Sequence, residues 1–419
     1  MEMKKYSNEF LGEEYYRINH KSGLTVYVMP KQNMKSCFAV FGTDYGSVDT
    51  RFAVKGKETT SVPEGIAHFL EHKLFESEEL DAFELYAKTG ANANAYTSFD
   101  KTCYLFSCTD NFDESIRILL DFVKHPYFTQ ETVEKEQGII GQEIKMYQDN
   151  PDWQVLFNLL RALYRKNPVR IDIAGTVESI AKINAELLYK CYSTFYNLSN
   201  MVLAVAGNVT PEQVMRAVDE KIEFEEAVEI VRETEEEPFD CVESYIEEEM
   251  HVEVKKFNLG FKEKIREDKL RYSILIGIAF DLICGKMTDF YDELISRRLI
   301  NSDFSTEYFS GRGFAVNIFG GESENPEEVR RLITERIAYL KENGVSEEEF
   351  EAVRRKKYGN EVKCFNDVDT LANALVSMHF ENYGLFDMFD IYRTVTKNDV
   401  DKIIRESFDP ALCALSVIK

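Results

Sequence analysis

Two stretches of this chain repeat one another, and the repeat limits the folds that the chain can adopt. Residues Gly141–Asp149 (GQEIKMYQD) resemble Gly359–Asp367 (GNEVKCFND), which begin 218 residues further on. Further landmarks recur in the same order, Gly65–Ala67 as Gly277–Ala279 and 183–205 as 395–417. Three landmarks at nearly one spacing predict a diverged tandem repeat, in which one structural unit is built twice.

The repeat divides the chain into two homologous domains, expected at 1–215 and 246–419 and joined by an acidic linker at 216–245. A chain of 419 residues is also too long for a single hydrophobic core. The linker segment 220–237 is rich in glutamate. We interpret it as a solvated connection or, alternatively, as an acidic surface that touches basic substrates.

Each half contains segments with the residue pattern of strands and segments with the hydrophobic periodicity of helices. Strands are expected at 24–29, 36–42, 102–108 and 201–206. Helices are expected at 64–76, 112–124, 129–147, 153–164 and 186–196. Strands near the start, middle and end of each half, with helices grouped between them, predict an α+β fold. In each domain a mainly antiparallel sheet would pack against helices.

Composition excludes several classes of function. Lysine and arginine total 50 against 74 aspartates and glutamates, which gives a net charge of −24. Such a chain repels phosphate backbones, so no nucleic acid partner is expected. No apolar run is long enough to span a membrane, and the N-terminal residues lack a secretory pattern. Eight scattered cysteines without a CxxC pair predict reduced thiols and a cytoplasmic protein.

Two of the six histidines lie in one short motif, His68-Phe-Leu-Glu71-His72. Residues three and four apart share one face of a helix, so both imidazoles and the Glu71 carboxylate can converge on one point. Two neutral imidazoles suit Zn²⁺, which takes four nitrogen, sulfur or oxygen ligands and keeps one position open in catalytic sites. Glu71 is placed to act as the base that activates a water.

A third protein ligand should be an acid from another helix. The segment 136–143 (EQGIIGQE) offers Glu136 and Glu143, which are seven residues apart and therefore share a helix face. Unpaired buried carboxylates are costly, so two acids on a partly apolar helix favour a bound cation. The alternative is that both acids are exposed and solvated.

The second repeat acts as an internal control for the motif. It carries Phe280, Ile283 and Cys284 at the positions of the two histidines and the glutamate. The repeat survives without these polar residues, so the fold does not require them. We therefore expect one metal site per chain, in the first half.

These motifs resemble the insulinase (pitrilysin) family, the inverted zincins. The resemblance rests on GIAHFLEHKLF at 65–75, NAYTS at 94–98 and EKEQGIIGQE at 134–143, and it continues through NPDW at 150–153 and PVRIDIAGT at 168–176. It is closest to the bacterial YmfH-like subgroup, dense over the first half and thin over the second. It implies a metallopeptidase fold like one half of the clamshell of mitochondrial processing peptidase.

The resemblance also implies roles for single residues. His68, His72 and Glu143 would ligate zinc, Glu71 would activate the water, and Glu136 would be a supporting carboxylate beside the site.

Substrate binding by β-addition along an edge strand is a further implication of the resemblance. The matching segment is 90–104, with Asn94 and Ala95 at the family's Asn-Ala position. The same segment would also serve as a plain turn between a helix and a strand.

One departure from the family pattern concerns the second half. Members usually carry an arginine followed by a tyrosine there, and both reach over the active site. Arg297 or Arg298 fits the arginine, but Phe304 stands where the tyrosine is expected, and Tyr308 lies four residues further on. A phenol that stabilises the oxyanion would contribute a few kcal/mol. A second chain, in a homodimer or a heterodimer, could supply the missing groups.

The sequence thus predicts a zinc metalloendopeptidase that hydrolyses short or unfolded peptides with a metal-activated water. The alternative is a non-hydrolytic or regulatory peptide-binding subunit that needs a paralogous partner chain.

Overall fold

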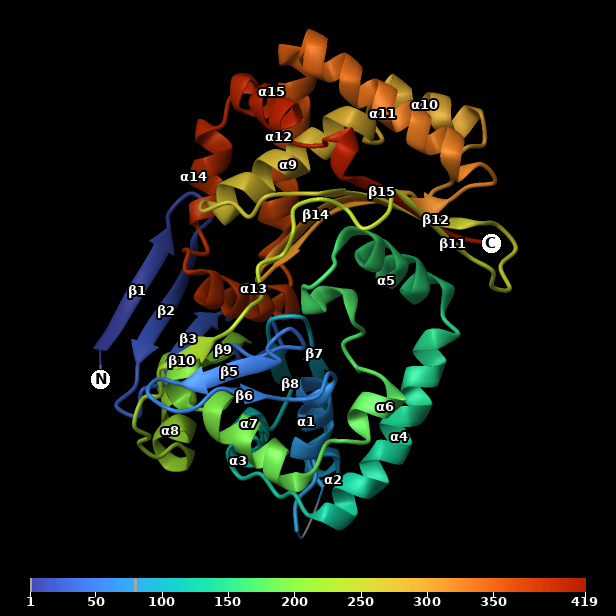
Figure 1. The fold of residues 1–419 in the computed structure, drawn as a ribbon. Helices are drawn as coiled ribbons and strands as arrows, with labels where there is room; N and C mark the ends of the chain where they lie inside the picture. The colour runs from blue at the N-terminus through green and yellow to red at the C-terminus, as the bar shows by residue number, and fades with distance from the viewer. Residues whose placement is uncertain (1, 79–80) are drawn as a thin grey trace. The chain divides into compact units, whose positions relative to one another are not determined.

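The computed structural model describes residues 2–78 and 81–419, and its internal contacts divide the chain into two compact units (Figure 1). The first unit comprises Met1–Ile144, Ile173–Glu233 and Val362–Leu385. The second comprises Lys145–Asp172, Thr234–Glu361 and Phe386–Lys419. Within the described residues, no helix has both the length and the apolar character that a membrane span requires.

The first unit is built on a seven-stranded sheet. In spatial order its strands are β1 (Glu2–Asn8), β2 (Glu13–Asn19), β3 (Thr25–Pro30), β9 (Met201–Gly207), β4 (Cys37–Thr43), β8 (Thr102–Cys108) and β7 (Asn92–Thr97). A smaller sheet contains β10 (Ile230–Arg232), β5 (Arg51–Val54) and β6 (Thr60–Ser61). Only β3 and β9 run parallel among neighbours of the large sheet, since its other pairs are antiparallel.

The first unit also contains helices, several of which pack on this sheet. They are α1 (Ile66–Leu74), α2 (Ala82–Thr89), α3 (Phe112–Lys124), most of α4 (Gln130–Gln148), α6 (Val177–Ile180), α7 (Ala185–Phe195), α8 (Pro211–Lys221) and α13 (Val368–Glu381). Every residue of the central strands β4 and β9 is buried, so both faces of the sheet are covered there. This explains why these two strands read as continuous apolar runs rather than as an alternating pattern.

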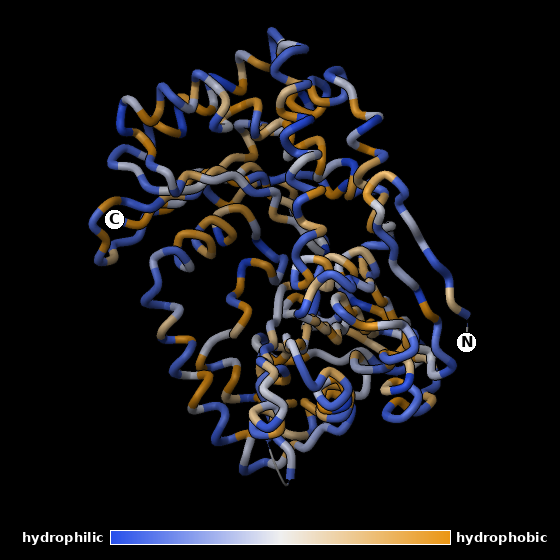
Figure 2. Tube along the Cα trace, turned by 180° about the vertical axis from the view of Figure 1, so that it is seen from behind, coloured by the Kyte–Doolittle hydropathy of each residue, from blue (hydrophilic) through white to orange (hydrophobic). Residues whose placement is uncertain are grey.

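The second unit repeats the plan with five strands. Their order is β11 (Tyr245–Glu248), β15 (Cys413–Ile418), β12 (Lys256–Lys262), β14 (Phe314–Glu322) and β13 (Ser305–Gly311). Its helices are α5 (Pro151–Leu163), α9 (Lys269–Cys284), α10 (Asp289–Ser296), α11 (Pro326–Asn343), most of α12 (Glu347–Cys364), α14 (Asp387–Thr394) and α15 (Lys397–Glu406). Hydrophilic and hydrophobic stretches alternate along the helices (Figure 2), as expected where one helix face packs on a core.

The two repeats exchange one helix. α5 belongs to the first repeat but packs against β12 and β15 of the second unit, whereas α13 packs against β4 and β9 of the first unit. Matching glycines allow the close approach, because a Cβ at Gly42 would lie 3.0 Å from Val376 and a Cβ at Gly260 would lie 2.7 Å from Leu159. The compact units therefore differ from the sequence repeats by this exchange. The boundaries 1–215, 216–245 and 246–419 stay a prediction about homology.

The α+β fold with mainly antiparallel sheets is confirmed. The predicted strands correspond to β3, β4, β8 and β9, and the predicted helices correspond to α1, α3, α4, α5 and α7. Part of the predicted linker is ordered, because β10 pairs with β5.

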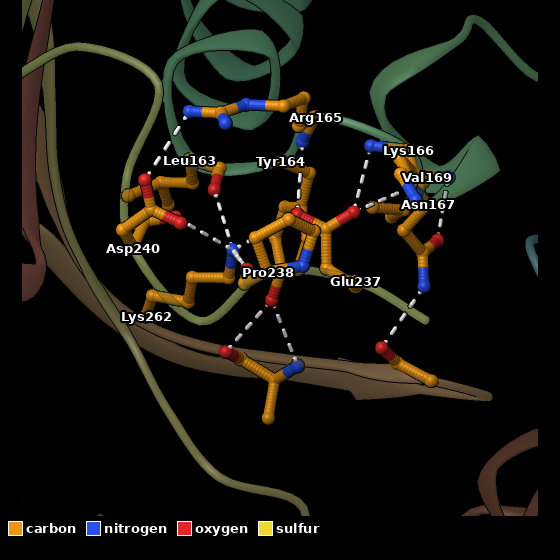
Figure 3. Close-up of polar contacts among 12 residues, drawn as sticks. Leu163, Tyr164, Arg165, Lys166, Asn167, Val169, Glu237, Pro238, Asp240 and Lys262 are labelled. Atoms are coloured by element: carbon orange, nitrogen blue, oxygen red, sulfur yellow. Dashed lines mark hydrogen bonds and ion pairs between the residues drawn. The ribbon is translucent and has the colours of Figure 1, made fainter. Parts of the chain in front are cut away.

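A buried lysine fastens the end of the linker segment inside the second unit (Figure 3). Lys262 is 3% exposed, and its ammonium donates hydrogen bonds to the carbonyls of Leu163 (2.8 Å), Pro238 (2.7 Å) and Asp240 (3.2 Å). It also pairs with the Glu237 carboxylate at 3.0 Å. These contacts join β12, the end of α5 and residues 237–240 of the predicted linker.

The Glu237 carboxylate is held from its other side by backbone donors. The N–H groups of Arg165, Lys166 and Asn167 donate to it at 2.9, 2.7 and 2.8 Å. Burial raises the pKa of Glu237, but these three donors and Lys262 outweigh it, so the pKa lies below its ordinary value. This glutamate therefore has a structural role within the acidic segment.

Replacing Lys262 with methionine should lower the free energy of unfolding by about 2–4 kcal/mol, because the variant leaves the partly buried Glu237 carboxylate without its counter-ion and three carbonyl oxygens without their donor. Urea unfolding measures the change. Lys264→Met, an exposed lysine two residues further on, is the matched control and should change stability by no more than about 0.5 kcal/mol. Equal unfolding midpoints for the two variants would contradict this account.

Candidate metal centre

The N-cap of helix α1 is a glycine that no other residue could replace without strain. Gly65 has a left-handed backbone with φ of 87°, and a Cβ there would lie 2.3 Å from the Ala174 carbonyl oxygen. The helix then packs against β7, β8 and α7. Its sides are therefore almost wholly buried, including the side chains of His68 and Glu71, each 8% exposed.

Helix α4 brings two acids to the histidines of α1. Glu143 Oε1 lies 3.6 Å from His68 Nε2, and Glu143 Oε2 lies 3.4 Å from His72 Nε2. Glu136, two turns earlier and 6% exposed, lies with Oε1 3.0 Å from His72 Nδ1. The structure thus brings together the histidine pair and both predicted acids.

Three of these side chains have the geometry of a metal-ligand set. One ligand atom each from His68, His72 and Glu143 lies within 4.8 Å of the others. In a tetrahedral zinc site with bonds of about 2.0–2.2 Å, ligand atoms are separated by about 3.4 Å. The two measured nitrogen–oxygen distances are close to that value. The donor set, two imidazoles and a carboxylate, is also one that zinc accepts, so the residues fit the ion.

The surroundings set the charge of each histidine differently. Burial, followed by the neighbouring His72, lowers the pKa of His68 to about 3, so this imidazole is neutral at physiological pH. Burial also lowers the pKa of His72, but its hydrogen bond to Glu136 and the charges of Glu71 and Glu143 outweigh burial and raise it. The His68 imidazole is therefore ready to act as a ligand, whereas the raised pKa of His72 makes protons compete more strongly with a metal for that ring.

Glu71 stands beside this set rather than in it. Burial raises the pKa of its carboxyl group to about 7, against the smaller opposing effects of His72 and of a hydrogen bond from Thr97. The Thr97 hydroxyl donates to Glu71 Oε2 at 3.1 Å. A carboxyl group with a pKa near neutrality can both accept and return a proton.

Sequence reasoning assigned no role to Thr97, although this residue lies in the NAYTS segment. The available signal was a hydroxyl residue two positions after Ala95, at the end of the expected strand region. Its partner across space could not be read from spacing alone.

The predicted substrate-binding residues lie on an edge strand. β7 is the last strand of its sheet, and Asn94 on it is exposed. The Ala95 N–H donates to the Asn94 side chain at 2.9 Å. The edge position is what β-addition requires, and the substrate role of both residues stays a prediction.

The arginines predicted to assist the site belong to the second unit. Arg297 follows α10, is exposed, and pairs with Glu293 at 2.9 Å and Glu328 at 2.7 Å. Arg298 is exposed with a left-handed φ of 54°. The metal-ligand set belongs to the first unit, so the part of these arginines in the site stays a prediction.

The two aromatic residues near the arginines differ in burial. Phe304 is 6% exposed, in the core of the second unit, and Tyr308 on β13 packs edge-on against Tyr272 at 5.1 Å. Phe304 therefore serves packing, which accounts for an apolar ring at that position.

The corresponding helix of the second unit contains no such site. Phe280, Ile283 and Cys284 on α9 are 3%, 0% and 2% exposed and belong to the hydrophobic core. At these positions the second repeat keeps the buried face and fills it with apolar side chains.

Comparisons with known proteins show the family of the chain. The sequence profile of the insulinase family, peptidase family M16, matches residues 58–177, and that of the peptidase M16 inactive domain matches 182–357. The zinc protease YmfH of Bacillus subtilis, itself uncharacterized, is 40% identical over 412 residues, which cover 96% of each chain. The beta subunit of mitochondrial processing peptidase from Caenorhabditis elegans is 33% identical over 37% of this chain and 35% of its own.

A solved structure extends the likeness to the whole fold. The crystal structure of an M16-like peptidase from Alicyclobacillus acidocaldarius has a TM-score of 0.93 and 35% identity. The match covers 97% of this chain and 98% of that one. The chain therefore belongs to the insulinase family, peptidase family M16, in the subgroup that YmfH represents.

Proposed function

We propose that this protein is a zinc-dependent endopeptidase that hydrolyses short or unfolded peptides. The observation that carries the proposal is the convergence of His68, His72 and Glu143 on one point, with the Glu71 carboxylate on the same buried helix face. The zinc proteases among its relatives support the proposal at the level of the family.

His68, His72 and Glu143 would hold one zinc ion per chain. When bound, zinc polarises the scissile carbonyl and lowers the pKa of a water to about 7. Three protein ligands leave a fourth position open, whereas structural zinc sites are usually closed by cysteines.

Glu136 would orient one ligand rather than bind the metal. Because its carboxylate accepts the hydrogen bond from His72 Nδ1, the Nε2 atom of that ring remains for ligation. A carboxylate in this position also raises the basicity of the imidazole.

Glu71 would move the protons of the reaction. Its carboxylate accepts a proton from the attacking water and then donates it to the nitrogen of the departing amine. Burial keeps its pKa near 7, where both transfers are feasible at physiological pH.

An extended peptide would pair with the open edge of β7, and Asn94 and Ala95 would contact its backbone. Backbone pairing is largely independent of sequence and needs an unfolded segment, which favours short or unfolded substrates.

A second chain completes the proposal. Arg297 or Arg298 would bind substrate, and a related chain, in a homodimer or a heterodimer, would supply the arginine and the phenol that complete the site. The naming of one relative as a subunit supports a partner. The proposed location is the cytoplasm, which the absence of any disulfide among the eight cysteines, all of them described residues, supports.

The alternative of a non-hydrolytic peptide-binding subunit is not favoured. A binding subunit would have no use for a buried carboxylate with a raised pKa beside a complete ligand set.

Glu71→Gln should reduce hydrolysis of a mixed library of unstructured peptides by about 10²–10⁴-fold, because it removes the proton acceptor and keeps its shape. Mass spectrometry of the products measures the loss. Zinc content measured on the same samples should be unchanged, since Glu71 is not in the ligand set. Full activity of this variant would contradict the assigned role.

Glu136→Ala should weaken zinc binding by about 10–100-fold, because it removes the acceptor that orients His72. Competition with a chromophoric chelator measures the affinity. Glu134→Ala, an exposed position on the same helix, is the matched control and should bind zinc like the native chain. A Glu136 variant with native affinity would refute the orienting role.

Zinc affinity should fall as the pH falls through the raised pKa of His72, because protonated imidazole cannot bind metal. His68 adds no dependence in that range, since its pKa is about 3. Titration of the metal-free chain at several pH values should show about one proton competing with each zinc ion. An affinity independent of pH between about 8 and 5 would contradict this.

A further inference from the structure

The Glu71 carboxylate is tied to a strand of the sheet by one side-chain hydrogen bond. The Thr97 hydroxyl donates to Glu71 Oε2 at 3.1 Å. Thr97 is the last residue of β7, and α1, which carries Glu71, packs against that strand. The bond therefore joins the helix of the proposed base to the edge strand.

The residue opposite Thr97 on the neighbouring strand supports Thr97 as the donor to Glu71. Thr102 lies directly opposite Thr97 in the ladder between β7 and β8. Its hydroxyl donates to the Tyr45 carbonyl at 2.9 Å and lies 3.5 Å from the Thr97 oxygen. A hydroxyl has one proton to donate. Thr102 donates its proton to the Tyr45 carbonyl, so the Thr97 proton is available for Glu71.

A threonine is well suited to fixing a carboxylate. Its β-branched side chain has restricted χ1 rotation, so the hydroxyl is held in one direction by the backbone. The terminal torsion of a glutamate is broad and has no comparable restriction of its own. A fixed donor therefore sets the plane of the Glu71 carboxylate by holding one of its oxygens toward the strand.

We infer that Thr97 is a positioning residue, which orients the Glu71 carboxylate for proton transfer. This inference rests on the proposed peptidase function and adds a residue to it. Asn94 and Ala95 lie on the same strand as Thr97. The bond thus links the orientation of the Glu71 carboxylate to the strand along which the peptide is proposed to lie. The same strand would then position both the base and the scissile bond.

The experiment compares two substitutions at one position. Thr97→Val keeps the shape and removes the hydroxyl, whereas Thr97→Ser keeps the hydroxyl. With the zinc-loaded chain and a peptide that it cleaves, Thr97→Val should lower kcat by about 10–100-fold with little change in KM. Thr97→Ser should recover most of the lost kcat. Thr102→Val removes the facing hydroxyl, which does not touch Glu71, and should keep the native kcat.

Two further readouts separate positioning from a general structural role. Zinc content and affinity should be native in Thr97→Val, because Thr97 does not contact the ligand set. A crystal structure of this variant should show the Glu71 carboxylate turned from its native direction. Native kcat in Thr97→Val, equal loss in both Thr97 variants, or a loss of zinc parallel to the loss of kcat would each overturn the inference.

Failure of the proposed function has a different signature. If the native chain binds zinc and cleaves no peptide, either alone or together with a related partner chain, the peptidase proposal fails. The crystal structures then decide the inference alone: a turned carboxylate in Thr97→Val supports positioning by Thr97, and an unchanged one overturns it.

Discussion

The burial of ionisable side chains on one face of α1 is the constraint on which the rest of this site depends. His68 and Glu71 are each 8% exposed, and removing such groups from water is costly unless they find partners or lose their charge. Burial lowers the pKa of His68 to about 3 and raises the pKa of Glu71 to about 7, so both groups move toward their uncharged forms. Partners come from two other elements, since Glu143 on α4 lies beside His68 and Thr97 on β7 donates a hydrogen bond to Glu71.

The tandem repeat shows what the fold requires without this chemistry. In the second unit the corresponding helix, α9, carries Phe280, Ile283 and Cys284 at the positions of His68, Glu71 and His72. These side chains belong to the hydrophobic core. A buried helix beside a sheet is thus the shared framework, and the polar residues are an addition to one copy of it. Because α5 and α13 are exchanged between the repeats, the sheet of each unit is covered by a helix of the other repeat.

Features that depend on the residue spacing within a single helix or strand could be predicted from the sequence. The spacing in His68-x-x-Glu71-His72 places three side chains on one helix face, and the spacing of Glu136 and Glu143 does the same on α4, as the structure shows. The central strands were recognisable because burial on both faces leaves a continuous apolar run. The exchange of α5 and α13 was not predictable, since the pattern of a helix reveals its buried face and not the sheet that covers it. Thr97 was missed because its bond to Glu71 joins residues on different elements.

The central claim is that His68, His72 and Glu143 form an open zinc site. Anomalous diffraction at the zinc edge from crystals of the zinc-loaded chain tests it most directly. The account predicts a single zinc ion bound by Nε2 of both histidines and by the Glu143 carboxylate, with a fourth position held by an exchangeable ligand. Zinc bound elsewhere, or four protein ligands closing the site, would contradict it.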